Sequence, residues 1–591
     1  MILQALNELY TRLADDPTYE IAPPGFSPQK ISFRIVIRPD GSLVQIEDAR
    51  IKNDKGKLVP DRMEVPAHQK RTSGVKPQFL CDKAEYLLGW SGDTERQVLA
   101  ASCFNAFKEE HLLYESKIND PGYSAVCRFL EKWSIDSKKG EISVELDKLN
   151  ELNGSFGVWI LQGEKAPIHN SEKIKNWWIQ LKANTASEHQ SQCLVSGKVS
   201  PVCRIHPDIK GFKSSIALVG IQENTSYESY GLSKTENCPI SSDVAFRYAT
   251  ALNALTDGPN RKRHRTRITD TTVVQWTDKP TLLEDIFSDF FEGHSQQAED
   301  SQDLSRLRQL ARLLAAIRAG SQYQELGEPS TFFYMLGLEQ PNPGRFSIRF
   351  FHRSTIADLL DKLHDHQRCM EIIRQFDKPV GKRMPDPEFP VIWQLLRETA
   401  RVAEEISPLL TGALTRSIIN GTPYPEGLFS AVIRRIHADR TINYLRAALL
   451  KAVLIRNHKQ TIPIMLDTTN KEPAYLLGRL FASLEKTQQD ALGDLNASLR
   501  DKFYASASAT PASVFPRILR TYSHHLAKLS GGSKVNRERL IQEILGAISA
   551  TGFPSNFNLK SQGLFAIGYY HQRKDFFTKK EITEIPESAS A

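Results

Sequence analysis

The strongest constraint on how this chain folds is a change in its hydrophobic periodicity near Pro280. Between residues 390 and about 550, apolar residues recur every three or four positions, as in VIWQLLRETARVAEEI and TINYLRAALLKAVLIRN. This spacing gathers apolar side chains on one face of a helix, so the sequence predicts a succession of amphipathic helices. One segment, RFSIRFF at 345–351, has the alternating pattern of a strand. The second half of the chain is therefore expected to be mainly helical.

The first half interleaves helices and strands irregularly. Apolar residues alternate in ISFRIVI at 31–37, and the turn sequence PDGS follows, which predicts a hairpin. A mostly polar loop is expected at 52–78 and mainly helical sequence at 82–152. The other predicted elements are a strand at 155–162, a helix at 243–255 and a strand at 266–276. Because this order lacks regular β–α–β spacing, the predicted fold class is α+β: a mixed N-terminal α/β domain with hairpins, followed by a helical-bundle C-terminal domain.

Three domains are predicted from these patterns. An α+β domain occupies 1–280, a mixed and mainly helical domain with one basic strand occupies 281–464, and a helical bundle occupies 465–591. The last boundary is placed at the polar sequence LDTTN, which follows Met465. Pro473 comes next, and proline suits the first turn of a helix.

Composition indicates a globular protein of the cytoplasm. Seven cysteines in 591 residues, an odd number, are no disulfide framework. No stretch approaches the ~18 unbroken apolar residues of a membrane span, so no membrane partner is expected. The N-terminal helix has no basic run before its apolar part, which argues against a signal peptide. The net charge of +7 is mild, so a polyanionic partner has to be argued from local clusters.

The motifs of common enzyme classes are missing, and we expect no catalytic activity, no cofactor and no metal site. The sequence has no Gly-rich phosphate-binding loop, no zinc-protease motif and no serine-hydrolase elbow. The alternative from another class is a metal-dependent nuclease that acts through Asp361, His364, Asp365 and His366. A solvated helix face is the plainer interpretation, because a two-metal site needs further ligands from elsewhere in the chain.

A zinc site is the second open alternative. Cys193, Cys203 and His206, with Cys238 beyond them, could supply four ligands. Their spacing is not that of a recognised zinc finger, and ordinary buried thiols are the plainer interpretation.

Clusters of basic residues are the more informative feature. The segment NRKRHRTR at 260–267 holds five Lys or Arg, and RFSIRFF places arginines on alternate positions of a strand. Between 416 and 459, eight Lys or Arg stand against two acids. Solvated faces and ion pairs are the alternatives to phosphate contact. The candidate nucleic-acid contacts in these clusters are Arg261, Lys262, Arg263, Arg345, Arg349, Arg434, Arg435, Arg446 and Lys451.

The long N-terminal loop contains a further candidate, the sequence QKRTSGVKPQ at 69–78. Lys, Arg, Ser and Thr are typical phosphate contacts, and Gln can pair with base edges. Glycine allows a close approach of the backbone to a ligand. The predicted contacts here are Lys70, Arg71, Thr72, Ser73, Gly74, Lys76 and Gln78.

At this loop and its continuation, RTSGVKPQFLCDKAEYLLG at 71–89, the chain resembles the large subunit of type I-C CRISPR Cascade surveillance complexes. Matching stretches follow in order along nearly the whole chain. They include SGKVSPVCRIHPDIKG at 196–211, AFRYATALNAL at 245–255, RITDTTVVQW at 267–276, NPGRFSIRFF at 342–351, AYLLGRLFASLEKTQQDAL at 474–492 and QGLFAIGYYHQRKDFF at 562–577. The family often has Asn where Gln78 and Lys83 stand here.

The resemblance implies a role in binding rather than in catalysis. Such a subunit reads the protospacer-adjacent motif (PAM) on duplex DNA, helps start unwinding into an R-loop, holds the displaced strand and docks a nuclease–helicase. Guide pairing reads the rest of the target. The implied partners are double-stranded target DNA, the displaced single strand, crRNA and the backbone, end and small subunits of Cascade. The family also makes its small subunit from the 3′ end of this gene, so 465–591 is expected to be small-subunit-like.

Overall fold

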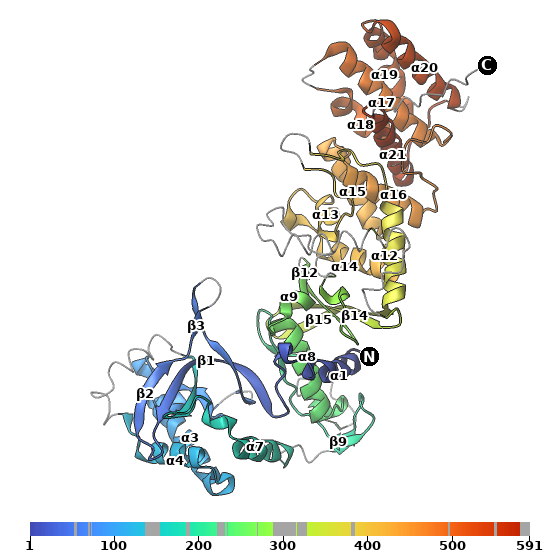
Figure 1. Cartoon of the computed structure of the whole chain (residues 1–591). Helices are drawn as coiled ribbons and strands as arrows, with labels where there is room; N and C mark the ends of the chain where they lie inside the picture. The colour runs from blue at the N-terminus through green and yellow to red at the C-terminus, as the bar shows by residue number, and fades with distance from the viewer. Residues whose placement is uncertain are drawn as a thin grey trace, which may run out of the picture. The chain divides into compact units, whose positions relative to one another are not determined.

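The computed structural model describes residues 1–52, 56–68, 71, 74–135, 154–184, 190–221, 231–232, 234–268, 270–285, 287, 315, 328–379, 384–493, 497–548 and 552–578. The chain separates into two compact units (Figure 1). Unit 1 comprises Met1–Lys210 and Ala217–Ala254, and unit 2 comprises Gly211–Ile216 and Leu255–Ala591. Strands concentrate toward the N-terminus and helices toward the C-terminus, which confirms the α+β fold class.

Unit 1 is built on a five-stranded mixed sheet. The long strand β1 (Phe26–Ile37) pairs antiparallel with β2 (Leu43–Asp48) and β5 (Asp61–Pro66), and parallel with β7 (Phe156–Leu161). The short strand β6 (Cys81–Lys83) pairs antiparallel with β7. The predicted hairpin is confirmed, and all four alternating apolar residues of ISFRIVI are fully buried. The expected polar loop at 52–78 is wrong for Asp61–Pro66, because these residues add a strand to β1.

Helices cover the sheet of unit 1 and bury the largest apolar side chains there. Phe79, Phe107 and Trp178 belong to this core, with the Phe79 and Trp178 rings stacked 4.6 Å apart. The helices of unit 1 that the structure describes are α1 (Ile2–Ala14), α2 (Ala84–Leu87), α3 (Gln97–Ile118), α4 (Pro121–Lys132), α7 (Glu172–Asn184) and α8 (Ser242–Asp257), the last of which runs on into unit 2. Shorter strands are β3 (Ile51–Lys52), β4 (Leu58–Val59), β8 (Gln190–Gln192), β9 (Val199–Pro201), β10 (Asp208–Ile209) and β11 (Ile216–Ala217).

Unit 2 begins with a four-stranded antiparallel sheet in the order β12–β13–β14–β15. Its strands are β12 (Arg265–Ile268), β13 (Thr271–Thr277), β14 (Phe332–Asn342) and β15 (Arg345–Thr355), preceded by the short helix α9 (Arg261–His264). The single strand predicted at 266–276 is in fact a hairpin of β12 and β13. β14, which sequence analysis missed, lies between β13 and the predicted basic strand.

The described residues of unit 2 that follow β15 are mainly helical, as predicted. Its helices are α12 (Ile356–Met370), α13 (Ile392–Arg397), α14 (Pro408–Asn420), α15 (Glu426–Asp439), α16 (Tyr444–Arg456), α17 (Pro473–Leu492), α18 (Leu499–Ala509), α19 (Pro511–Leu526), α20 (Gly531–Ala547) and α21 (Leu559–Asp575). α21 packs against both α16 and α17, and one hydrophobic core runs from the sheet to Tyr570. The domain boundaries predicted at 280/281 and 464/465 stay predictions. The helical stripe expected at 304–317 lies almost entirely outside the described residues.

Candidate nucleic-acid interface

The loop at 71–78 is tied to the core of unit 1 at both of its ends. Asp82 in β6 is fully buried, and its Oδ2 accepts hydrogen bonds from the Gln78 N–H at 2.8 Å and from the Arg71 guanidinium. Arg71 Nε also donates to the Lys76 carbonyl oxygen at 2.6 Å. The guanidinium carbon lies 4.0 Å from the centre of the Tyr86 ring. The loop therefore leaves and re-enters the fold at neighbouring points.

The predicted contacts in this loop divide into an inward and an outward group. Gln78 is only 4% exposed and Arg71 is held by Asp82, so these two side chains differ from their predicted outward orientation. Gly74 and Lys76 are exposed, as is Val75 between them. Gly74 has a φ of +75° and nothing within 4 Å of the position of a Cβ atom, so its backbone is open to a ligand. Lys70, Thr72 and Ser73 lie outside the described residues.

A strained residue follows the loop directly. Leu80 is fully buried with a φ of +55°, a left-handed conformation that is unfavourable for a bulky side chain. Its N–H donates to Nε2 of buried His111 at 3.1 Å, and Nδ1 of that ring lies 2.8 Å from the Phe107 carbonyl oxygen. Burial lowers the pKa of His111 to about 4, so the ring is neutral near pH 7 and can accept the bond from Leu80. The end of the loop is thus fixed in one conformation.

The basic segment at 260–267 is ordered rather than a loop. Arg261 and Lys262 are exposed on α9. Arg263 instead forms two contacts to Asp285, at 2.5 Å from Nε and 3.1 Å from Nη2. Of the three predicted contacts here, Arg261 and Lys262 therefore face solvent, whereas Arg263 is in an ion pair.

The strand β15 carries its arginines differently from the simple alternation that the sequence predicted. Gly337 pairs with Phe350 and Leu338 with Ile348, so Arg349 is the extra residue of a β-bulge. The bulge shifts the alternation, and Ile348 is 50% exposed although it is apolar. Arg349 forms an ion pair with Glu339, and Arg345 is exposed near the start of the strand.

Two of the cations predicted on exposed helix faces are buried. Arg446 is 7% exposed and bridges Glu398 at 2.7 Å and Asp439 at 2.5 Å. Lys451 is 2% exposed and donates to the Glu371 carbonyl oxygen, and burial lowers its pKa to about 8. The expectation that they lie on a surface is wrong, because their neighbours along the helix are apolar and both faces of α16 are packed.

The neighbouring helix α15 keeps one of its two candidates on the surface. Arg434 is exposed, whereas Arg435 contacts Asp439 at 2.5 Å, one turn later. An i,i+4 pair of this kind neutralises much of its own charge. Arg434 is therefore the more available cation for a phosphate.

Sequence analysis missed a basic surface on α19. No Asp or Glu occurs between Asp501 and Glu538, a stretch that contains six Lys or Arg. Val514, Phe515 and Ile518 form the buried side of α19. The exposed side carries Arg, His and Lys residues at intervals of three and four residues, which align along a helix. We name this surface the α19 basic face and define it as Arg517, Arg520 and His524 on the helix, with Lys528 just past its C-terminal end.

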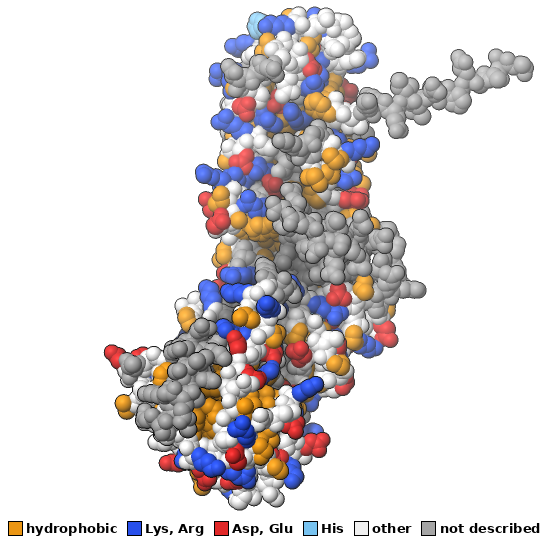
Figure 2. Space-filling model, turned by 60° about the vertical axis from the view of Figure 1, so that its left-hand side comes forward, with side chains coloured by type: hydrophobic (Ala, Val, Ile, Leu, Met, Phe, Trp, Pro, Cys, Tyr) orange, Lys and Arg blue, Asp and Glu red, His pale blue; other side chains and the backbone are white. Residues whose placement is uncertain are grey.

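The positive charges of the α19 basic face are not neutralised by acids within their own stretch of sequence. Arg517 lies 5.4 Å above the Phe503 ring, a contact that leaves its charge intact. Lys and Arg side chains are scattered among uncharged ones at the top of Figure 2, the part of unit 2 in which Figure 1 labels α19 and α20. The signal that could have revealed this face is the local absence of acids. Over 465–591 as a whole, 16 Lys or Arg stand against 12 acids, so the local excess of positive charge does not show in the total.

The two candidate metal sites do not come together among the described residues, where no group of three His, Cys, Asp or Glu side chains could hold a metal ion. His366 is fully buried, with Nδ1 2.7 Å from the Tyr424 hydroxyl, whereas Asp361 is exposed on the same helix. His206 likewise pairs with the Tyr248 hydroxyl at 2.8 Å, and the Cys193 thiol accepts the Ser241 N–H at 3.3 Å.

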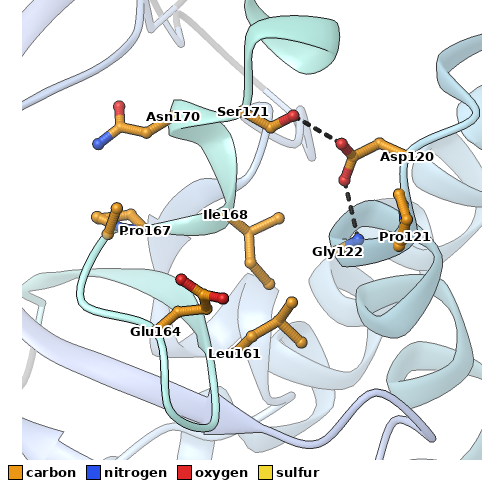
Figure 3. Close-up of a pocket in the computed structure, with 10 residues that line it drawn as sticks. Asp120, Pro121, Gly122, Leu161, Glu164, Pro167, Ile168, Asn170 and Ser171 are labelled. Carbon is orange, nitrogen blue, oxygen red and sulfur yellow. Dashed lines mark hydrogen bonds between the residues drawn. The ribbon is translucent and has the colours of Figure 1, made fainter.

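Unit 1 also contains a pocket of about 320 Å³, whose buried acid is engaged in structural hydrogen bonds (Figure 3). Its buried acid, Asp120, accepts the Gly122 and Tyr123 N–H groups at 2.9 and 3.0 Å and so caps α4. The second carboxylate oxygen accepts the Ser171 hydroxyl at 2.6 Å. Because capping and a side-chain bond occupy both oxygens, Asp120 is a structural residue.

Comparison with known families gives a match over nearly the whole chain. A model of the family described as CRISPR-associated protein (Cas_Csd1) matches residues 6–577. The chain is a member of the CRISPR-associated Cas_Csd1 family. A comparison with curated protein sequences gives no significant match. Membership confirms that this is a CRISPR-associated protein and supports a component of Cascade.

The family match covers every surface described above. It includes the loop at 71–78, the sheet of unit 2 and the α19 basic face. No helix among the described residues of this Cas_Csd1 protein is both long and apolar enough to cross a membrane.

His366 gives a prediction that tests whether its ring is a neutral group of the core. Burial lowers its pKa to about 3, compared with about 6.5 in an unfolded chain. Between these values only the unfolded state takes up the proton, so the free energy of unfolding falls as the pH falls. His366→Gln should remove up to ~1.4 kcal/mol per pH unit of this slope between pH 6.5 and 4. Urea unfolding at pH 7, 6 and 5 measures the slope, and an unchanged slope would show that His366 titrates normally.

Proposed function

We propose that this chain is the large subunit of a type I-C Cascade complex and acts as a DNA-binding protein in the cytoplasm. It reads the PAM in duplex DNA, promotes R-loop formation, holds the displaced strand and docks the nuclease–helicase. Its partners are crRNA and the backbone, end and small subunits. The observation that carries the proposal is the loop at 71–78, anchored at both ends with Gly74, Val75 and Lys76 facing solvent, in a member of a CRISPR-associated family.

An anchored loop suits the reading of a short motif. Base reading requires a side chain at a fixed distance from the groove, and a loop held by a buried carboxylate supplies a fixed base. Lys76 brings a positive charge to the tip, and Gly74 leaves room for the phosphate backbone. Guide pairing then reads the remaining target, so the protein needs contacts to only a few base pairs.

Holding the displaced strand requires exposed cations rather than paired ones. The described surface offers Arg345, Arg434 and the α19 basic face, all exposed. Arg517 and His524 are seven residues apart on one helix face, roughly 10 Å at the helical rise, which spans one to two phosphates of an extended strand. We therefore assign strand binding to these residues and not to Arg446 or Lys451.

Lys76→Ala tests the motif-reading part of the proposal. In the assembled complex, the variant should bind motif-bearing duplex more weakly by ~1–3 kcal/mol if Lys76 contacts a base. If Lys76 contacts only a phosphate, the loss should be similar on all duplexes, and the salt slope should fall by ~0.9. Lys165→Ala, an exposed lysine between β7 and α7, is the matched control. If both variants bind motif-bearing and motif-less duplexes as the wild type does, this loop is not the reader.

A further inference from the structure

The Asp82 carboxylate joins the two ends of the loop at 71–78 through one atom. Its Oδ2 accepts the Arg71 guanidinium from the start of the loop and the Gln78 N–H from the end, and its Oδ1 accepts the Lys83 N–H at 2.8 Å. The carboxylate is fully buried, so water does not compete for these bonds. A buried charge of this kind persists only when it is paired and hydrogen-bonded, as it is here.

Two of the donor groups of Arg71, Nε and Nη2, are engaged inside the protein. One side of its guanidinium lies over Tyr86, Nε donates to the Lys76 carbonyl oxygen and Nη2 donates to Asp82. The Tyr86 hydroxyl in turn lies 3.4 Å from the Lys76 N–H, in position to accept it. Arg71 therefore crosses the base of the loop and holds the C=O side of Lys76, while Tyr86 holds its N–H side.

We propose that Asp82 is a positioning residue for DNA-motif reading, and that Arg71 acts as its partner inside the protein rather than as a contact to DNA. The Asp82–Arg71–Tyr86 clamp holds the backbone of Lys76 so that the exposed tip meets the duplex in one geometry. This inference rests on the proposed function, because it assumes that the loop meets DNA. It adds that the motif preference depends on a buried carboxylate that never touches the ligand.

The chemistry of the clamp explains why a carboxylate is needed at position 82. An amide has the same shape, but it is neutral, so it binds a guanidinium and two backbone N–H groups more weakly. Position 71 likewise requires an arginine. The guanidinium group donates from Nε and Nη2 in two fixed directions, which a lysine side chain cannot do. Loss of either Asp82 or Arg71 should therefore free the backbone of the loop in the same way.

A double-mutant cycle in the assembled complex tests the inference. Asp82→Asn, Arg71→Gln and the double variant are compared for binding to motif-bearing and motif-less duplexes. Each single variant should lose ~10-fold in affinity for motif-bearing duplex, because a small displacement of a positioned group is sufficient for such a loss. Binding to motif-less duplex should change much less. The double variant should lose no more than either single variant, since both remove one clamp.

Asp48→Asn is the control, since Asp48 forms an ion pair with Arg50 at 2.6 Å on a different part of unit 1. It should leave both affinities unchanged.

Hydrogen exchange of the Gln78 and Lys76 amides gives a readout that does not depend on DNA, and both should exchange faster in Asp82→Asn and Arg71→Gln. Should Asp82→Asn fail to fold, Arg71→Gln and Tyr86→Phe still test the clamp, because Arg71 is partly exposed and Tyr86→Phe keeps the ring.

Three results would overturn the inference. If Arg71→Gln lowers affinity far more than Asp82→Asn and the losses add in the double variant, Arg71 contacts DNA directly. If Asp82→Asn leaves motif preference unchanged while Lys76→Ala reduces it, the loop reads DNA without the clamp. If Lys76→Ala and all clamp variants are silent, the proposed function of the loop fails together with the inference.

Discussion

Replacing Arg517, Arg520 and Lys528 by glutamate is expected to weaken binding of the displaced strand roughly 100-fold or more. Each cation on the α19 basic face that meets a phosphate contributes ~0.7 to the salt slope for a single strand, and charge reversal adds repulsion to that loss. The three positions are exposed and lie in a stretch without any acid. The substitution should leave the fold intact, because the buried side of α19 is unchanged.

The effect should appear at one step of target binding only. R-loop formation, followed by permanganate reactivity of the displaced strand, should fall sharply, whereas initial motif-dependent binding should change little. Lys378→Glu with Lys471→Glu is the control, since both lysines are exposed in the same unit and lie outside α19. Equal losses at both steps, or an equal loss in the control, would contradict a strand-binding role for this face.

Gly478→Ala is expected to destabilise the C-terminal helices by about 3 kcal/mol or more. α17 and α21 cross with glycines at the contact, and a Cβ on Gly478 would lie 2.1 Å from the Phe565 carbonyl oxygen. A Cβ on Gly568 would lie 2.2 Å from the Tyr475 carbonyl oxygen, so the two backbones touch from both sides. Because the obstructing atoms are backbone, the helices have to move apart, and overpacking of this kind is costly.

Gly546→Ala provides a control for which we expect the free energy of unfolding to rise rather than fall. Gly546 also lies in a helix, α20, but nothing is within 4 Å of its Cβ position. Alanine there should stabilise the helix by up to ~1 kcal/mol through its higher propensity. Urea unfolding followed by circular dichroism compares the two variants. If Gly478→Ala is as stable as Gly546→Ala, the helices do not pack through these glycines.

Hydrophobic periodicity predicted much of the fold, because the apolar face that a helix or strand buries is visible within its own stretch of sequence. The ISFRIVI strand, the helix at 243–255 and the helical second half all carry patterns that point to one partner surface. β5 and β14 were missed because their burial depends on pairing with other strands. Residues Asp61–Pro66 include three charged side chains and look like a loop until β1 lies beside them.

The candidate site was harder to predict because exposure is a property of tertiary structure. Arg446 and Lys451 look like surface cations in sequence, but Glu398 and the Glu371 carbonyl receive them inside the protein. Arg71 was identified as part of the right loop and given the wrong orientation, since its partner Asp82 lies eleven residues away. The α19 basic face could have been found by counting acids locally.

The central claim is that the exposed tip of the loop at 71–78 reads a short motif beside the target. The most direct test is selection by the assembled complex from duplexes in which the base pairs flanking a guide-matched target are randomised. The wild type should enrich a particular flanking sequence, and Lys76→Ala combined with Gly74→Pro should reduce that enrichment while target pairing persists. The same enrichment with wild-type and altered tips, or no enrichment by the wild type, would contradict the account.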